Sequence, residues 1–293
     1  MYIYGEVLQM KQFEYQDELC RGTLRRLDYV GLGGNRKYAM IYRPYGYDEA
    51  SDRRYNIFYM VHGGNGNPDS WLDSCPMKNV LDHCFAAGEA EPMIVVYPTF
   101  YADGPKRPNG AIDEAFERGS ILRFQQELVE LLIPAVEGGV RGYAEGTEPE
   151  ELRRVRTHRG VGGFSMGGSA TWYSFSKCPE YFSVFLPLSG DSWELEIMGG
   201  RTQPEETARR LRECMTDKGF GPEDFNIFAA TGTEDIAYPN LTPQIEAMRS
   251  MDDFFRFSEA PERGNLHYLL GEGMYHTYDT VCQYFYNWLP FLF

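Results

Sequence analysis

Short apolar runs that alternate with helix-patterned segments constrain the fold of this chain more than any other feature. Each run is rich in Val, Ile, Phe or Tyr, as expected for strands of a sheet that is covered on both faces. Between the runs, apolar residues recur at helical spacing, for example at Met77, Val80 and Leu81. The alternation predicts an α/β fold with a mostly parallel central sheet and helices on both faces. The predicted strands are 38–43, 55–61, 93–97, 160–164, 183–188, 225–230 and 266–270.

Length and charge narrow the functional classes. The chain has 293 residues and a formal net charge of −15, from 28 Lys and Arg against 43 Asp and Glu. Nucleic acids and anionic membranes bind proteins that neutralise their charge, so neither is an expected partner. No stretch reaches the roughly 20 apolar residues of a membrane-spanning helix. We expect one catalytic domain over residues 1–293, with 1–20 interpreted as an extension or linker.

Cysteine spacing and the N-terminal segment bear on the compartment. The six cysteines include no C-x-x-C pair, so they indicate neither a metal site nor dithiol chemistry. The first thirty residues carry scattered charges and no apolar core, so we expect no signal peptide. As written, the chain is expected in the cytoplasm. It would be secreted if the sequence is a mature form or a domain excised from a longer protein.

A serine at position 165 lies at the centre of a G-x-S-x-G match over 163–167. The match follows a predicted strand and opens a helix-like stretch, which is the context of a nucleophile elbow. Such a turn strains the serine backbone, requires small neighbours and places the hydroxyl above the sheet. The dipole of the following helix favours an anion formed there. We therefore predict that Ser165 is a nucleophile.

A serine nucleophile needs a base, and the base needs an orienting carboxylate. His276 lies six residues beyond the last predicted strand and just before the final helical segment, where an α/β-hydrolase carries its base. Asp235 follows the strand 225–230, and the order Ser165, Asp235, His276 matches that of α/β-hydrolases. Glu234 and Asp191 are the alternatives for the acid.

An H-G-G sequence after the strand 55–61 predicts the remaining part of the site. Acyl transfer needs backbone N–H groups directed at the developing oxyanion, and one of them commonly comes from such a loop. We predict the amides of Gly64 and Met166 as the two donors, with Asn65 as the alternative to Gly64. His62 is interpreted as a residue that braces the loop.

Several segments beyond these motifs carry a resemblance to a known family. Besides 163–168, they are 44–48, 55–59, 62–64, 94–96, 98–100, 188–193, 229–232, 234–238 and 243–248. The sequence resembles the feruloyl esterases of carbohydrate esterase family 1 over nearly the whole chain. This resemblance implies one α/β-hydrolase domain, no cofactor, and hydrolysis of the ester that joins ferulate to the arabinose side chains of xylan. On this likeness Ser165, Asp235 and His276 fall on the family's triad.

The resemblance also bears on substrate binding. Trp193 falls on an aromatic residue that lines the family's phenolic pocket, and a flat feruloyl ring suits aromatic contacts. Tyr238 and Tyr275 lie close in sequence to the catalytic loops and are further candidates, for which packing in the core or at the rim is the alternative. The segments 101–117 and 194–207 depart from the family pattern and are expected to shape the pocket.

The expected partner is therefore feruloylated arabinoxylan or its oligosaccharides. The same predicted catalytic residues would also suit an acetyl xylan esterase, an S-formylglutathione-type thioesterase or an enzyme that transfers the acyl group to a sugar. A glycan-binding module without catalysis is the alternative from another class. It predicts that an organophosphonate does not label Ser165.

Overall fold

Eight strands form one sheet in the computed structural model, which describes residues 20–102 and 113–293. The strands are β1 (Thr23–Val30), β2 (Arg36–Arg43), β3 (Ile57–Val61), β4 (Ile94–Tyr97), β5 (Arg159–Phe164), β6 (Val184–Leu188), β7 (Asn226–Gly232) and β8 (Leu266–Gly271). Their order is β1-β2-β4-β3-β5-β6-β7-β8. Strands β3 to β8 run parallel, and β1 and β2 are added antiparallel at one side. The predicted α/β-hydrolase fold with a mostly parallel sheet is confirmed.

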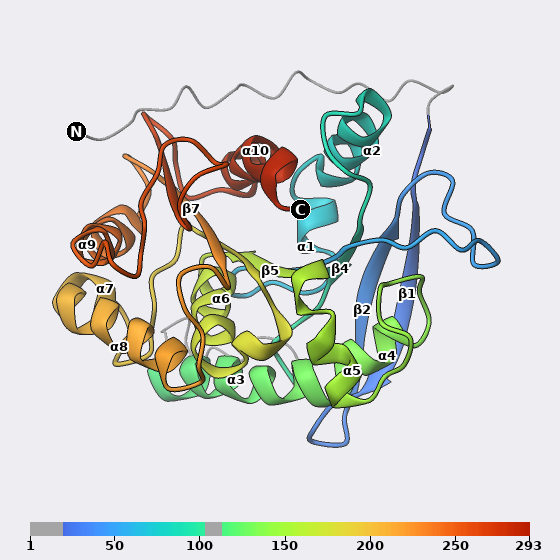
Figure 1. The fold of residues 1–293 in the computed structure, drawn as a ribbon, viewed down its shortest axis with the longest axis horizontal. Helices are drawn as coiled ribbons and strands as arrows, with labels where there is room; N and C mark the ends of the chain where they lie inside the picture. The colour runs from blue at the N-terminus through green and yellow to red at the C-terminus, as the bar shows by residue number, and fades with distance from the viewer. Residues whose placement is uncertain (1–19, 103–112) are drawn as a thin grey trace.

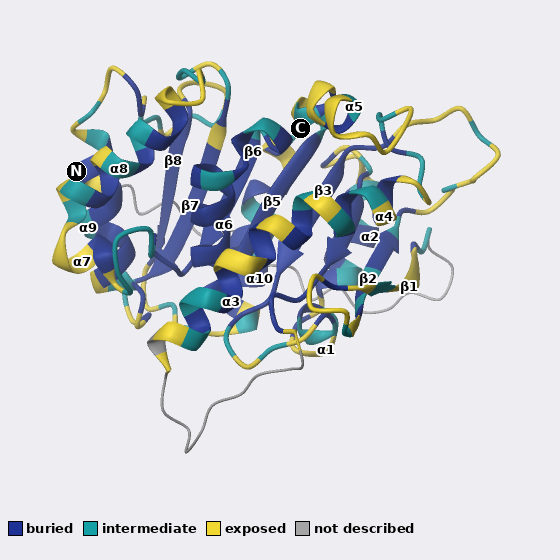
Figure 2. Cartoon of the chain, turned by 90° about the horizontal axis from the view of Figure 1, so that it is seen from below, coloured by how far each residue is buried: buried dark blue, intermediate teal, exposed yellow. Residues whose placement is uncertain are grey.

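The predicted apolar runs coincide with β2 to β8, whereas β1 was not predicted. The central strands are buried along their whole length, so their sequences are continuous apolar runs. Strand β1 lies at the edge of the sheet and pairs only with β2, with most of its residues exposed. Figure 2 shows this contrast between the buried centre and the exposed edge. A charged edge strand discourages pairing with other chains, and the same charges hide it from an apolar pattern.

Helices cover both faces of the sheet, and each face has its own apolar core. The helices are α1 (Ser70–Asp73), α2 (Met77–Ala87), α3 (Glu114–Glu127), α4 (Ile133–Glu137), α5 (Pro149–Arg154), α6 (Met166–Lys177), α7 (Gly199–Thr202), α8 (Pro204–Thr216), α9 (Tyr238–Arg249) and α10 (Tyr278–Trp288). Shorter helical segments are η2 (Leu128–Leu132), η3 (Arg156–His158), η4 (Pro179–Tyr181) and η5 (Leu289–Phe291). In Figure 1, α2 and α10 lie above the sheet, and α3, α6 and α8 lie below it.

The register of the parallel strands places their carboxyl ends at one edge of the sheet. Phe164 at the end of β5 pairs with Leu188 at the end of β6, and Leu188 pairs with Ala230 of β7. Gly232, which ends β7, pairs with Gly271, which ends β8. The loops that follow β5, β6, β7 and β8 therefore start side by side, and such an edge is where α/β sheets bind ligands.

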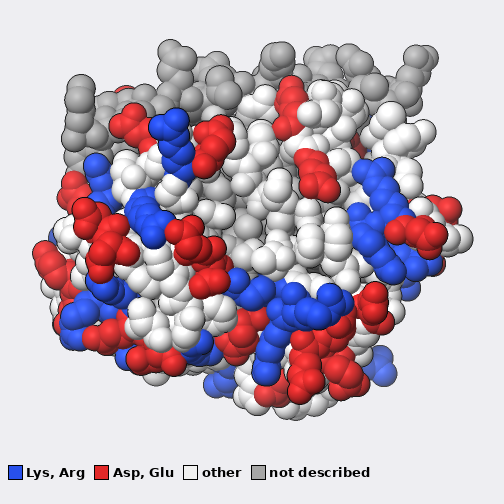
Figure 3. All heavy atoms as spheres, viewed as in Figure 1, with Lys and Arg blue, Asp and Glu red and all other residues white. Residues whose placement is uncertain are grey.

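The surface carries charges of both signs. On the face shown in Figure 3, Lys and Arg side chains are interspersed with Asp and Glu over the coloured residues. Exposed ion pairs such as Arg154–Glu151 and Arg212–Asp253 are part of this pattern. A polyanion gains affinity from a continuous positive surface, which this mixed face does not offer. Within residues 20–102 and 113–293, the helices are too short or too polar for one to cross a bilayer.

Candidate active site

Ser165 lies at the turn between β5 and α6 with a strained backbone. Its φ of 57° and ψ of −116° are outside the regions that a serine ordinarily adopts. The turn is possible because its neighbours are small: a Cβ on Gly163 would meet the Gly167 carbonyl at 2.7 Å, and one on Gly167 would meet the Val61 oxygen at 2.4 Å. Strain of this kind recurs at active sites, and it presents the side chain at the edge of the sheet.

His276 contacts Ser165 and Asp235 from the loop between β8 and α10. Its Nε2 lies 2.9 Å from Ser165 Oγ, and its Nδ1 lies 2.6 Å from Asp235 Oδ1. A carboxylate only accepts hydrogen bonds, so Nδ1 carries the ring proton and Nε2 accepts from the serine hydroxyl. The ring packs against Phe164, with centroids 4.6 Å apart. The structure thus joins the three side chains into one hydrogen-bonded row.

Asp235 lies in the turn after β7 and is fully buried as a side chain. Its Oδ1 also accepts a hydrogen bond from the Ala237 amide at 2.7 Å, which fixes the carboxylate. Of the two alternatives, Glu234 is exposed, and Asp191 is bonded to Trp193 and to the Gly200 amide. The structure brings only Asp235 of these three carboxylates to the histidine.

The Gly63–Gly66 turn lies beside the serine, and Gly64 and Met166 both border the same cavity. Met166 is the first residue of α6, so its amide belongs to the positive end of that helix. The Asn65 amide donates to the hydroxyl of Tyr101 at 3.2 Å. The Asn65 amide, which was the alternative to Gly64 as an oxyanion donor, is therefore already hydrogen-bonded within the protein.

His62 holds this loop and does not approach the serine row. It is buried, and its ring nitrogens lie 2.7 Å from the Gly63 carbonyl oxygen and from Thr99 Oγ1. Burial lowers the pKa of His62 to about 4, so its ring stays neutral at ordinary pH. His158 stacks on Tyr143, and His267 is buried against Phe228. These contacts are structural.

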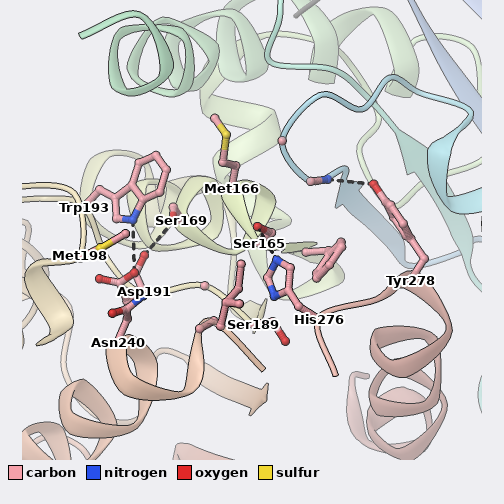
Figure 4. Close-up of a pocket in the computed structure, with 16 residues that line it drawn as sticks. Ser165, Met166, Ser169, Ser189, Asp191, Trp193, Met198, Asn240, His276 and Tyr278 are labelled. Carbon is pink, nitrogen blue, oxygen red and sulfur yellow. Dashed lines mark hydrogen bonds between the residues drawn. The ribbon is translucent and has the colours of Figure 1, made fainter. Parts of the chain in front are cut away.

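A cavity of about 370 Å³ opens beside the serine and is shown in Figure 4. Trp193, Asp191 and Asn240 lie on one side of Ser165 in this view, and Tyr278 lies on the other. Its lining residues are Gly63, Gly64, Phe164, Ser165, Met166, Ser169, Ser189, Gly190, Asp191, Trp193, Met198, Ile236, Ala237, Asn240, His276 and Tyr278. The volume suits an aromatic acyl group.

The far end of the cavity is polar. Burial raises the pKa of Asp191 to about 6, although the Gly200 amide and the Trp193 indole N–H both donate to its carboxylate. Asn240 Oδ1, which lies near Asp191 in Figure 4, is also buried and has no hydrogen-bond partner within the part of the chain that the structure describes. Buried polar atoms are ordinarily bonded, so this end of the cavity suits a ligand with polar groups.

The predicted substrate-binding residues are placed differently from one another. Trp193 lines the cavity and is half-buried. Tyr238 packs against the core at the start of α9, and Tyr275 is 61% exposed beside His276. Neither tyrosine is among the lining residues.

Other lining residues were missed by the sequence analysis. The segment 194–207 contributes Met198, whereas 103–112 lies outside the described residues. Ile236 and Asn240 also border the cavity, and the only available signal was their position within five residues of Asp235.

In the described residues, no three His, Cys, Asp or Glu side chains are grouped so as to hold a metal ion.

The sheet, the strained serine turn and the serine–histidine–aspartate row define an α/β-hydrolase site. Comparison with known proteins gives the family. Residues 32–249 match the model of the Esterase family, which bears the description "Putative esterase", and the chain belongs to this family.

One curated relative is endo-1,4-beta-xylanase Y of Acetivibrio thermocellus, which is 37% identical over 273 residues. The match covers 93% of this chain and 23% of the xylanase. The chain therefore spans about a quarter of the length of this relative.

Solved structures give a similar result. The feruloyl esterase module of Clostridium thermocellum, complexed with sinapinate, matches with a TM-score of 0.81 and 36% identity, covering 96% of this chain and 90% of that one. A ferulic acid esterase of Anaeromyces mucronatus matches with a TM-score of 0.71 and 18% identity, covering 94% and 92%. The second likeness shows the fold alone.

Proposed function

We propose that this chain is a serine esterase, formed by a single catalytic domain, which hydrolyses feruloyl and related hydroxycinnamoyl esters on the arabinose side chains of xylan. The observation that carries the proposal is the hydrogen-bonded row of Ser165, His276 and Asp235 at a cavity that suits an aromatic acid. The similarity to a feruloyl esterase module complexed with sinapinate supports the acyl group. The similarity to a xylanase supports xylan as the carrier.

In the first step, Ser165 Oγ attacks the ester carbonyl while His276 Nε2 accepts the hydroxyl proton across the 2.9 Å contact. The imidazolium that forms is stabilised by Asp235, whose buried carboxylate also keeps the proton on Nδ1 before the attack. The tetrahedral oxyanion is received by the amides of Gly64 and Met166.

His276 then protonates the departing sugar alcohol, and the acyl group stays on Ser165 as an ester. Water enters, gives its proton to His276, and attacks the acyl-enzyme carbonyl. Collapse of the second tetrahedral intermediate releases the hydroxycinnamic acid and restores the serine hydroxyl. Apart from this water, each step uses only side chains and backbone amides of the chain.

The cavity supports an acyl group with a ring. The indole of Trp193 offers a flat apolar surface, and Met198 and Ile236 add apolar contacts near the opening. The polar atoms of Asp191 and Asn240 would suit the hydroxyl and methoxy groups of a phenolic ring that entered the cavity. An acetyl group would leave most of this volume unfilled.

Tyr275 is proposed to act on the other side of the ester. It is next to His276 and largely exposed, outside the cavity, so it can contact the sugar that His276 protonates. Tyr238, which packs on the core, is proposed to support the pocket from behind through the start of α9.

A substrate panel tests the proposed function. Purified protein is assayed with methyl ferulate, methyl sinapate, acetylated xylan and a glutathione thioester. We expect the highest kcat/KM for the two hydroxycinnamate esters, and release of ferulate from feruloylated arabinoxylan oligosaccharides. Preference for acetylated xylan or for the thioester would replace the proposal with one of the alternative esterases.

A further inference from the structure

The loop that carries Gly64 is held by hydrogen bonds to the amides of Gly63, Asn65 and Gly66 and to the carbonyl of Gly63. Gly63 to Gly66 form a turn closed by the Gly66 amide, which donates to the Gly63 oxygen at 3.1 Å. Asn65 has a φ of 62°, the positive value that the third position of a type II turn requires. A non-glycine residue stays in that conformation only where its surroundings enforce it.

Tyr278 holds one side of the turn. Its hydroxyl accepts a hydrogen bond from the Gly63 amide at 3.0 Å. The ring is fixed by edge-on contacts with Trp71 and Phe164, at centroid distances of 5.2 and 4.9 Å. Tyr278 is the first residue of α10 and follows His276 by two positions, so one short segment carries both the base and a support of the loop.

Tyr101 holds the other side. Its hydroxyl accepts the Asn65 amide at 3.2 Å and donates to the carboxylate of Glu117 at 3.0 Å. Glu117 is fully buried in α3, and the ring of Phe116 stacks on that of Tyr101 at an interplanar angle of 12°. The hydroxyl is therefore fixed in position by its ring and by its own acceptor.

His62 fixes the carbonyl group of the same turn. A carbonyl oxygen only accepts, so His62 Nδ1 carries the proton and donates to the Gly63 oxygen, and Nε2 accepts from Thr99. The amides of Gly63 and Asn65 and the carbonyl of Gly63 thus all have partners. Between them, the Gly64 amide has no acceptor within residues 20–102 and 113–293, and Gly64 borders the cavity.

We infer that Tyr278 and Tyr101 are positioning residues for the oxyanion donor, an inference that rests on the proposed esterase function. By engaging the amides on either side, the two hydroxyls leave the Gly64 N–H as the one directed at the reacting carbonyl. The oxyanion exists only along the reaction path, so this positioning stabilises the transition state more than the bound ester.

The variants Tyr278→Phe and Tyr101→Phe test this inference, because each removes one hydroxyl and keeps the ring. We expect kcat for methyl ferulate to fall about 10- to 100-fold in each, with KM unchanged. Inhibition by a boronic acid, which forms a tetrahedral adduct on the serine oxygen, should weaken by a similar factor. The matched control is Tyr42→Phe, which removes a buried tyrosine hydrogen bond to Asp82 from β2, a strand that contributes no residue to the cavity.

Parent protein and Ser165→Ala are assayed alongside, and thermal unfolding is recorded for every variant. If the parent is inactive on hydroxycinnamate esters, or if Ser165→Ala retains its rate, the proposed function itself fails. If the parent is active and both tyrosine variants, folded as the parent is, match Tyr42→Phe in kcat and in boronic acid inhibition, the positioning role is overturned. A loss expressed in KM alone contradicts it as well.

Discussion

The row of Ser165, His276 and Asp235 and the cavity wall around Trp193 are built in different ways. Ser165, Asp235 and His276 each come from a loop at the end of a parallel strand, and each has a defined hydrogen-bond partner in the row. Trp193 and Met198 come from the segment after β6, which leads into α7. The strand register fixes the first group, whereas the second depends on how loops and short helices pack.

Because of this difference, we expect one set of residues to carry out the reaction and another to select the substrate. The register of β5, β7 and β8 places the catalytic loops side by side whatever the acyl group is. The pocket wall is formed by the loop after β6, as far as Met198, and by the start of α9, which packs against α7. Substitutions in the row should therefore abolish turnover of every ester, and substitutions in the wall should change which ester is preferred.

The largest effect is expected for Ser165→Ala. Removing the nucleophile of a triad costs about 10⁶ in kcat, and here it should do so for hydroxycinnamate and acetate esters alike. Steady-state assays on methyl ferulate and p-nitrophenyl acetate measure this loss. Ser176→Ala, at the far end of α6, is the control. A variant at 165 that keeps the parental rate on either ester contradicts the assignment.

Asp235→Asn should have the next largest effect, a loss of about 10⁴ in kcat. An amide at this position favours the wrong ring tautomer of His276 and does not stabilise its charged form. Glu234→Gln is a matched control because it neutralises the adjacent, exposed carboxylate. Equal losses in the two variants would show that net charge, and not the bond to His276, is responsible.

Trp193→Ala tests the pocket wall. We expect kcat/KM for methyl ferulate to fall about 10- to 100-fold, because the ferulate ring loses the aromatic surface on which it packs. Hydrolysis of p-nitrophenyl acetate should stay close to the parental rate. The ratio of the two specificity constants is the measured quantity. An unchanged ratio would mean that the acyl ring lies elsewhere.

The smallest effect is expected for the ionisation of Asp191, which should change the stability of the folded protein with pH. Because its folded-state pKa is raised to about 6 by burial, the folded protein binds this proton more tightly than the unfolded chain. Its stabilising contribution is present below the ordinary pKa and is lost as pH rises through about 6.

Comparison with Asp191→Asn isolates this contribution, since other titrating groups such as His62 cancel in the difference. The melting temperature of the parent relative to the variant should decline by a few degrees between acidic and neutral pH. A constant difference across that range would contradict the raised pKa.

Much of the fold was predictable because central parallel strands are buried on both faces. Strands β2 to β8 are visible as apolar runs, and the loops at their carboxyl ends could then be searched for catalytic residues. Strand β1 was missed because most of an edge strand is exposed to solvent, so its sequence is not a continuous apolar run. It contains the charged residues Arg25, Arg26 and Asp28.

The pocket was less predictable because closeness in sequence does not fix where a side chain points. Ile236 and Asn240 border the cavity, while Tyr238 between them packs on the core. Met198 reaches the cavity through the local path of 194–207, which no periodic pattern encodes. Trp193 was found through a family resemblance and not through a pattern of spacing.

Covalent labelling is the most direct test of the hydrogen-bonded row. The protein is treated with an organophosphonate, and the modified peptide is located by mass spectrometry. We expect one label on Ser165, formed much more slowly in His276→Ala and absent in Ser165→Ala. A parent protein that hydrolyses methyl ferulate but is labelled at another residue, or stays unlabelled, would show that a different group attacks the ester.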